Sequence, residues 1–174
     1  CLYNTATPFI TEELKTKILA KQALYNAAVN DLISTIPVSA PEAIKERMIY
    51  AKILLNSYYN LNAKWNGVCE DNWSAYGIMC NGYGVCESYS ESFQHLLNSV
   101  GIRCTGIEGY AGGGHKWNAV CIEDEWYQCD ITFDDPIGNS PDEAYNYYLN
   151  ITDEQMAQSH NWSDYEFSVP VCTA

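Results

Sequence analysis

The feature that most constrains the fold is a change of periodicity at Gly101. Before this residue, apolar side chains recur at the three- and four-residue spacing of helices, and after it the spacing becomes two. Strands are predicted at IRCTGIEGY (102–110), HKWNAVCI (115–122) and EWYQCDITF (125–133), with a further edge strand at YNYYLNI (145–151). Helices that precede a run of neighbouring strands predict an α+β fold with an antiparallel sheet.

Three helices are predicted before Gly101. The first follows Thr11, a residue type suited to an N-cap, and contains apolar positions at Leu14, Ile18, Tyr25, Ala28 and Leu32. The second starts at a capping box made by Ser39 and Glu42. Its predicted core face consists of Ile44, Met48, Ala51, Leu55 and Tyr58. The third covers 86–100 and ends at Gly101, after a long irregular segment at 60–84.

Charge narrows the range of partners. The formal net charge of −13 excludes nucleic acid as an expected partner, because no basic stripe is present to displace counterions. No apolar run approaches the roughly 20 residues that span a bilayer, so no transmembrane segment is expected. The first residue is Cys1, which fits either an arbitrary boundary or a mature terminus downstream of an export signal. The choice between these two stays open, and in either case we expect an extracellular or cell-surface protein, of which a lipoprotein is one form. The sequence does not predict an oligomeric state.

One of the 8 cysteines stands out by its position. Cys86 follows Gly82 and Gly84 and opens the third helix, where the free N–H groups and the helix dipole favour a thiolate. For any single cysteine, an inert buried side chain is the competing interpretation. Disulfides between Cys69 and Cys80, and between Cys1 and Cys172, are left open because the distances do not follow from the sequence.

A cysteine nucleophile needs an imidazole base, and the chain offers 3 histidines. His95 lies nine residues along the helix from Cys86, which places it roughly 13 Å away and out of reach. His160 falls in a polar tail. His115 opens a predicted strand after three glycines, which makes it the candidate base.

The predicted hairpin supplies an orienting carboxylate for this histidine. If Glu123 and Asp124 form a two-residue turn, Trp117 lies opposite Asp130. His115 is two residues from Trp117 and shares its face, within diagonal reach of Asp130. The register therefore predicts that His115 pairs with Asp130, as base and orienting group for Cys86, with Trp117 shielding the hydrogen bond between the histidine and the aspartate from water.

Three segments carry a resemblance to a known family. GVCESYSESFQHLLNSVGI, GGGHKWNAV and EWYQCDITFDDP resemble the transglutaminase-like superfamily in its bacterial branch. The matching positions are Gly84, Cys86, His115, Trp117, Trp126, Tyr127, Asp130, Thr132, Asp134, Asp135 and Pro136. The resemblance implies a papain-like core at 37–162, preceded by an N-terminal helical extension at 1–36, within a single domain of 1–174.

The resemblance also implies a thiol enzyme that acts on peptide or protein amides, by acyl transfer or by hydrolysis. The backbone N–H of Cys86 is expected to bind the oxyanion, with Tyr76 as the side-chain candidate for a second donor. No cofactor and no metal are expected. Spaced oxygen ligands of a calcium loop and paired zinc-type spacings are both absent from the sequence.

Two alternatives to an active enzyme remain open. Many relatives have glycine where this chain has Ser88, Glu87 adjoins the nucleophile, and Cys80 replaces a glutamine that donates to the oxyanion in papain-type relatives. These departures favour a peptide- or cell-wall-binding module that keeps the fold with weak or no activity. A disulfide-stapled adhesion domain is the remaining alternative.

Overall fold

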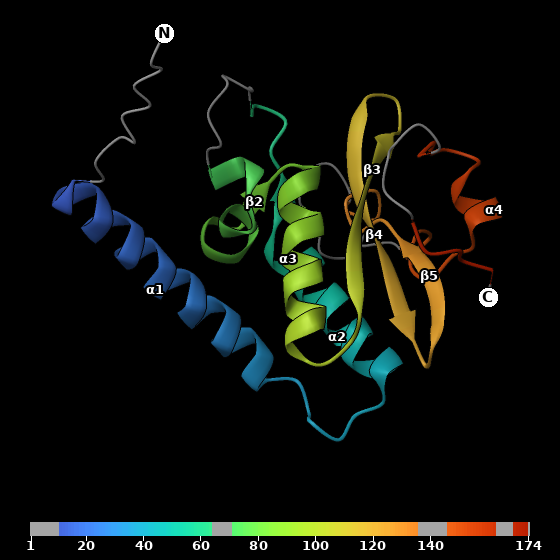
Figure 1. Ribbon diagram of the computed structural model, residues 1–174, viewed down its shortest axis with the longest axis horizontal. Coiled ribbons are helices and arrows are strands. Elements are labelled where there is room, and N and C mark those ends of the chain that lie inside the picture. Colours follow the sequence, from blue (N-terminus) through green and yellow to red (C-terminus); the bar gives the residue numbers. More distant parts are fainter. Residues whose placement is uncertain (1–10, 64–70, 136–145, 163–168, 174) are drawn as a thin grey trace, which may run out of the picture.

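The structure is a computed structural model that describes residues 11–63, 71–135, 146–162 and 169–173. It combines helices with an antiparallel sheet, so the predicted α+β class is confirmed (Figure 1). In chain order the elements are α1 (Glu12–Ser34), α2 (Glu42–Asn56), β1 (Tyr58–Tyr59), the 3-10 helix η1 (Asp71–Trp73), the π-helix η2 (Gly77–Asn81), β2 (Tyr83–Gly84), α3 (Cys86–Ser99), β3 (Cys104–Tyr110), β4 (Gly114–Ile122), β5 (Glu125–Cys129) and α4 (Asp153–Met156).

The hairpin between β4 and β5 has the predicted register. Its turn residues Glu123 and Asp124 both have positive φ, 53° and 69°, as a two-residue type I′ turn requires. Ile122 consequently faces Glu125. The sheet order is β3-β4-β5, with β4 in the centre. The last paired residues are Asn118 and Cys129, and Asp130 directly follows β5.

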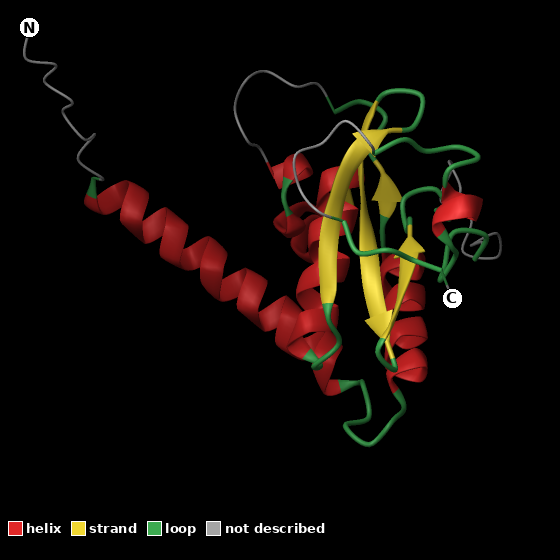
Figure 2. Cartoon of the chain, turned by 45° about the vertical axis from the view of Figure 1, so that its right-hand side comes forward, coloured by secondary structure: helices red, strands yellow, loops and turns green. Residues whose placement is uncertain are grey.

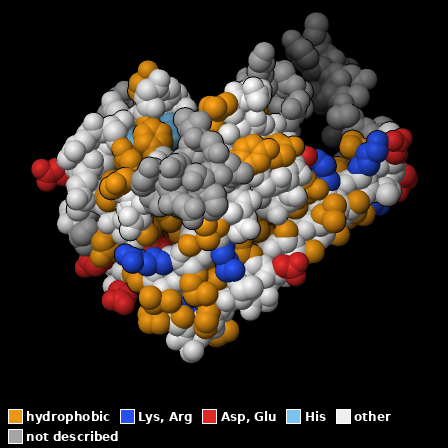
Figure 3. Space-filling model, turned by 180° about the vertical axis from the view of Figure 1, so that it is seen from behind, with side chains coloured by type: hydrophobic (Ala, Val, Ile, Leu, Met, Phe, Trp, Pro, Cys, Tyr) orange, Lys and Arg blue, Asp and Glu red, His pale blue; other side chains and the backbone are white. Residues whose placement is uncertain are grey.

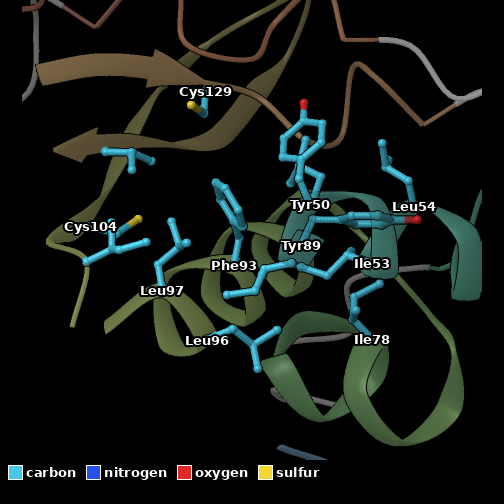
Figure 4. Close-up of a cluster of buried hydrophobic side chains, with 14 of the residues drawn as sticks. Tyr50, Ile53, Leu54, Ile78, Tyr89, Phe93, Leu96, Leu97, Cys104 and Cys129 are labelled. Atoms are coloured by element: carbon cyan, nitrogen blue, oxygen red, sulfur yellow. The ribbon is translucent and has the colours of Figure 1, made fainter. Parts of the chain in front are cut away.

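The core lies between α2, α3 and the sheet. Helix α3 packs along β3 and β4, and α2 packs against α3 (Figure 1). Figure 4 shows side chains from α2, η2, α3 and the sheet converging, among them Tyr50, Ile78, Phe93 and Cys129. Phe93 and Leu97 have no exposed surface, and full burial of such side chains stabilises a fold by about 1.5–3 kcal/mol each. This packing fixes the N-terminus of α3 against the sheet.

The predicted core face of α2 is wrong. Ile44 and Leu55 are 48% and 54% exposed, whereas Ile49 and Ile53 are buried. The buried face also contains Glu46, which the hydrophobic pattern assigned to the surface. Its burial is compensated because its carboxylate accepts a hydrogen bond from the side chain of Asn150, 2.6 Å away.

The N-terminus of α2 also differs from the prediction. Pro41 precedes the first helical residue, and no side chain caps the helix. The capping box predicted at Ser39 and Glu42 is therefore not formed. The carboxylate of Glu42 instead accepts the backbone N–H of Glu123 at 2.8 Å, which joins the start of α2 to the hairpin turn.

Helix α1 is largely separate from the body of the protein. Its predicted cap is confirmed, since Thr11 Oγ1 accepts the backbone N–H of Leu14 at 3.2 Å. The outer half of the helix projects away (Figure 2), and its Ile18 and Leu24 are 49% and 59% exposed. Apolar side chains are visible along α1 from behind (Figure 3). Val29, in the inner half, is the residue of α1 that is buried in the core.

Two irregular regions differ from the sequence prediction. The part of the predicted edge strand that is described, 146–151, contributes an isolated bridge between Ile151 and Gln128 rather than a strand. At the end of the predicted irregular segment, β2 forms a short parallel pair with β1, which directly precedes that segment, and Tyr59 lies opposite Gly84. Among the described helices, none is both long and apolar enough to cross a membrane.

The described cysteines are free thiols: Cys80, Cys86, Cys104, Cys121, Cys129 and Cys172. The two disulfides considered from the sequence each need Cys1 or Cys69. Both of those residues lie outside the described part of the chain.

Candidate active site

Backbone geometry places Cys86 at the first position of α3. Gly82 has a φ of +73°, a conformation that suits glycine, and it ends η2. A Cβ on Gly84 would lie 2.5 Å from the Cβ of Ser88, so the first turn of α3 packs directly on this glycine. The two glycines thus let the chain turn tightly into the helix. Cys86 is half-buried and lines a cavity of about 430 Å³.

His115 lies between Cys86 and Asp130. Its Nε2 is 2.6 Å from Asp130 Oδ2, and Cys86 is near enough to the ring to raise the pKa of His115. Because Nε2 is bound to the carboxylate, Nδ1 is the ring nitrogen left to face the sulfur. Strand β4 supplies His115, the residue after β5 supplies Asp130, and α3 supplies Cys86. The structure therefore brings together the three residues that the spacing predicted.

The site favours a protonated His115. Burial alone would lower the pKa of His115, but the Asp130 carboxylate and the Cys86 sulfur outweigh it and raise this pKa to about 9. Burial would likewise raise the pKa of Asp130, but hydrogen bonds from His115 and His160 hold it below its ordinary value. The carboxylate therefore stays ionised beside the imidazolium.

Asp130 is held by four donors. Oδ1 accepts the backbone N–H groups of Thr132 and Phe133 at 2.9 and 3.2 Å. Oδ2 accepts His115, and also His160 Nε2 at 2.9 Å. Asp130 has no exposed surface. A buried carboxylate with this many donors has a fixed orientation as well as a fixed charge.

His160 is the residue of this site that sequence reasoning missed. The sequence placed it in a polar tail, yet it is 4% exposed and its ring lies 5.5 Å from that of His115. It also contacts the rings of Trp117 and Phe133, at 4.9 and 4.8 Å between centroids. Its backbone N–H donates to Met156 in α4, so the end of that short helix positions it. No hydrophobic periodicity in the sequence predicts that His160 is buried beside His115.

Trp117 covers the pair formed by His115 and Asp130. The Trp117 side chain is 1% exposed, and its ring stacks on His115 at 5.8 Å and 20°. The indole N–H donates to Gln128 Oε1 at 2.6 Å, which fixes the ring. This placement is consistent with the predicted shielding of the hydrogen bond between His115 and Asp130.

Tyr59, rather than Tyr76, is the tyrosine beside Cys86. The Tyr59 hydroxyl lies near the backbone of Cys86, which lowers the pKa of Tyr59 against the larger effect of burial, and Tyr59 lines the same cavity. Tyr76 lies at another contact, with Lys21 Nζ 4.8 Å from its ring centroid and a side-chain hydrogen bond to Cys80. The parallel pairing of β1 with β2 is what brings Tyr59 to this position.

The two departures next to Cys86 have structural explanations. Glu87 points toward Lys116 Nζ, 3.4 Å away. Lys116 also lies 3.4 Å from Glu91, so a cation balances the acidic first turns of α3. Ser88 is buried, and its Oγ donates to the backbone carbonyl of Asn72 at 2.6 Å. Neither residue obstructs the sulfur.

The cavity walls are mostly apolar or glycine. Beside Cys86 and His115, the lining residues are Tyr59, Leu61, Ala111, Gly112, Gly113, Gly114, Thr132, Phe133 and Asp135. The Tyr89 hydroxyl donates a hydrogen bond to Asp135 Oδ2. Burial raises the pKa of Asp135 to about 6. The hollow is open enough for an extended chain or a side chain to reach the sulfur.

Within the described residues, one cluster brings three potential metal ligands together. His115, Asp130 and His160 have donor atoms within 4.8 Å of one another. Both imidazoles, however, direct Nε2 to the same oxygen of Asp130. In this arrangement both nitrogens donate hydrogen bonds to Asp130. The three side chains are therefore arranged around the carboxylate and not around a common position for a metal ion.

Comparisons with known proteins agree with this architecture. The sequence model of a family described as Transglutaminase-like superfamily matches residues 32–131, more than half of the chain. A solved structure described as a TGase superposes with a TM-score of 0.52 at 14% identity, over 74% of this chain and 35% of that one. At this identity the likeness bears on the fold alone.

Two further solved structures resemble the chain more weakly. A Cytophaga hutchinsonii protein described as a proposed cysteine protease gives a TM-score of 0.48 at 20% identity, over 64% of this chain and 37% of its own. A Parabacteroides distasonis protein described as a proposed protease gives 0.43 at 14%, over 62% and 22%. The chain thus spans well under half of each solved protein. No curated protein matches the sequence.

Proposed function

Because the chain belongs to the transglutaminase-like superfamily, we propose that it is a thiol enzyme that acts on peptide or protein amides. The observation that carries the proposal is the position of His115, which is hydrogen-bonded to Asp130 and lines the same cavity as Cys86, close enough for Cys86 to raise its pKa. A thiol, an imidazole and a buried carboxylate in this order are the groups that nucleophilic acyl transfer requires.

In the proposed reaction His115 begins as the imidazolium, in agreement with its raised pKa. The Cys86 thiolate attacks the carbonyl carbon of the amide, and the tetrahedral intermediate collapses with loss of the C–N bond. The His115 imidazolium gives its proton to the departing amine, which leaves a thioester and a neutral imidazole. His115 then takes a proton from the incoming amine or water as it attacks the thioester. Breakage of the C–S bond restores the thiolate and the imidazolium.

Asp130 supports both halves of this cycle. It keeps the proton of His115 Nε2 in place, so that Nδ1 exchanges its proton with sulfur and substrate. Its charge also stabilises the imidazolium, in agreement with the raised pKa of His115. The four hydrogen bonds to Asp130 favour the same orientation throughout the cycle.

The oxyanion would be bound by the backbone N–H of Cys86 and the hydroxyl of Tyr59. Both groups lie at the same cavity, so a substrate oxygen bound between them would receive a hydrogen bond from each. The sequence predicted Tyr76 in this role, and its contacts with Lys21 and Cys80 favour Tyr59 instead. The cavity does not distinguish a transferase from a hydrolase.

The proposal is tested with a glutamine-containing peptide and a fluorescent primary amine. Ammonia release reports attack on the amide, and amine incorporation reports transfer, while ammonia release without incorporation reports hydrolysis. A panel of unmodified peptides, followed by mass spectrometry, covers cleavage of the main chain.

The informative variants are Cys86→Ala and Tyr59→Phe, with Cys80→Ala as the control at another half-exposed free thiol. We expect no activity in the first, a loss of about 100-fold or more in kcat in the second, and normal activity in the control. Activity that survives in Cys86→Ala would refute the nucleophile. Peptide binding without turnover by the wild-type protein would favour the binding module.

A further inference from the structure

Two imidazoles share a single oxygen of the buried carboxylate. His115 Nε2 and His160 Nε2 lie 2.6 and 2.9 Å from Asp130 Oδ2. The side chains of Asp130 and His160 have no exposed surface, and that of His115 is 8% exposed. Since Asp130 is ionised, both Nε2 atoms must carry protons to satisfy it.

The second nitrogen of His160 has a partner that fixes this tautomer. Ser159 Oγ lies 2.8 Å from His160 Nδ1, and Tyr148 Oη lies 3.2 Å from the same serine oxygen. With Nε2 protonated, Nδ1 accepts the proton of the serine hydroxyl. A hydrogen-bonded chain thus runs from the exposed Ser159 through His160 to the carboxylate of Asp130.

The backbone around His160 is also fixed. Its N–H donates to the carbonyl of Met156 at 3.0 Å, at the end of α4. The next residue, Asn161, pairs with Tyr110 at the end of β3. His160 is therefore held from two directions, although it lies beyond the last residue of the family match at 131.

We propose that His160 is a positioning residue for the reaction, acting through Asp130. This inference rests on the proposed function of Cys86, His115 and Asp130. Without a donor from His160, Oδ2 would be held by His115 alone, and the hydrogen bond that orients the base would lose its fixed direction. The expected consequence is a slower chemical step with unchanged substrate binding, because His160 does not line the cavity.

A packing role makes the opposite prediction. The His160 ring contacts Trp117, Phe133 and Tyr148 at 4.9, 4.8 and 5.6 Å between centroids. If these contacts were its contribution, phenylalanine would replace it well and glutamine would replace it poorly. If the N–H donor matters, glutamine, whose side-chain amide can reach the position of Nε2, is the better substitute.

The test compares His160→Phe, His160→Gln and Ser159→Ala with the wild-type protein. We expect His160→Phe to lose about tenfold to a hundredfold in kcat with little change in KM, as removal of an outer partner of a functional imidazole typically does. His160→Gln should recover most of this loss. Ser159→Ala keeps the ring and loses the group that sets its tautomer, so a smaller fall in kcat is expected.

A second readout does not depend on turnover. The low-field proton resonance of His115 Nε2–H should be present in the wild-type protein and in His160→Gln, and broadened or lost in His160→Phe. Full kcat and an unchanged resonance in His160→Phe would overturn the inference, as would Phe performing better than Gln. If the wild-type protein turns over no amide, the proposed function fails, and the resonance still decides the role of His160.

Discussion

Replacement of Asp130 by asparagine isolates the electrostatic part of the site. The asparagine Oδ1 can still accept the backbone N–H groups of Thr132 and Phe133, so the local turn is retained. The asparagine Nδ2, however, meets the two imidazole N–H groups that Oδ2 accepts in the wild-type protein. Donors would then face donors, and His115 would have to move its proton from Nε2 to Nδ1.

The magnitude follows from the pKa of His115. It stands at about 9 against an ordinary 6.5, despite burial that acts in the opposite direction. That difference corresponds to about 3 kcal/mol in favour of the imidazolium. Cys86 contributes to this shift as well, so Asp130→Asn removes the part due to Asp130; together with the wrong tautomer, this loss should lower kcat by about 100-fold.

The assay is ammonia release from the glutamine peptide as a function of pH, with a thermal unfolding scan to establish that Asp130→Asn is folded. Asp124→Asn is the matched control, because Asp124 is an exposed hairpin residue whose positive φ asparagine also tolerates. If folded Asp130→Asn kept more than about a tenth of the wild-type kcat, the electrostatic role of Asp130 would be refuted.

Two other predictions concern pH. As the pH rises through about 9, His115 loses the proton that it gives to the leaving amine, so kcat/KM should fall there. The raised pKa of His115 also stabilises the folded protein. This contribution is complete below about pH 6.5 and is lost as the pH rises through about 9, so the free energy of unfolding in urea should be lower at pH 10 than at pH 7. Burial, opposed by hydrogen bonds from Asn150 and Cys129, raises the pKa of Glu46 to about 7, so stability should fall as the pH rises from about 4.5 to 7. Glu46→Gln should therefore stabilise the protein at pH 8 by up to about 3 kcal/mol and by little at pH 4.5, with the exposed Glu125→Gln unchanged at both. An equal effect of Glu46→Gln at both pH values would contradict the shifted pKa.

The parts of the site that the sequence predicted depend on local rules. The Glu-Asp turn determines the register of β4 and β5, and this register brings His115 and Asp130 to one face. The two glycines and the helix signal locate Cys86 at the first position of α3. Each of these inferences needs only residues that are near in sequence, or strands joined by a two-residue turn. Such patterns can be interpreted without knowing how distant segments pack.

The errors at Glu46 and His160 share one physical origin: a polar side chain is buried when a distant group compensates for its desolvation. Glu46 belongs to the core because Asn150, far along the chain, donates to its carboxylate. His160 is buried because Asp130 and Ser159 satisfy both ring nitrogens. A hydrophobic pattern assigns both residues to the surface, since it scores each side chain without its partner. The choice of Tyr76 over Tyr59 has a different cause, because the two-residue pairing of β1 with β2 has no periodic signal in the sequence. Sequence reasoning cannot identify the distant partners of a buried polar group. Removal of such a group should nevertheless affect the site most. His160 is accordingly a sharper test of this architecture than any residue that the sequence had already identified.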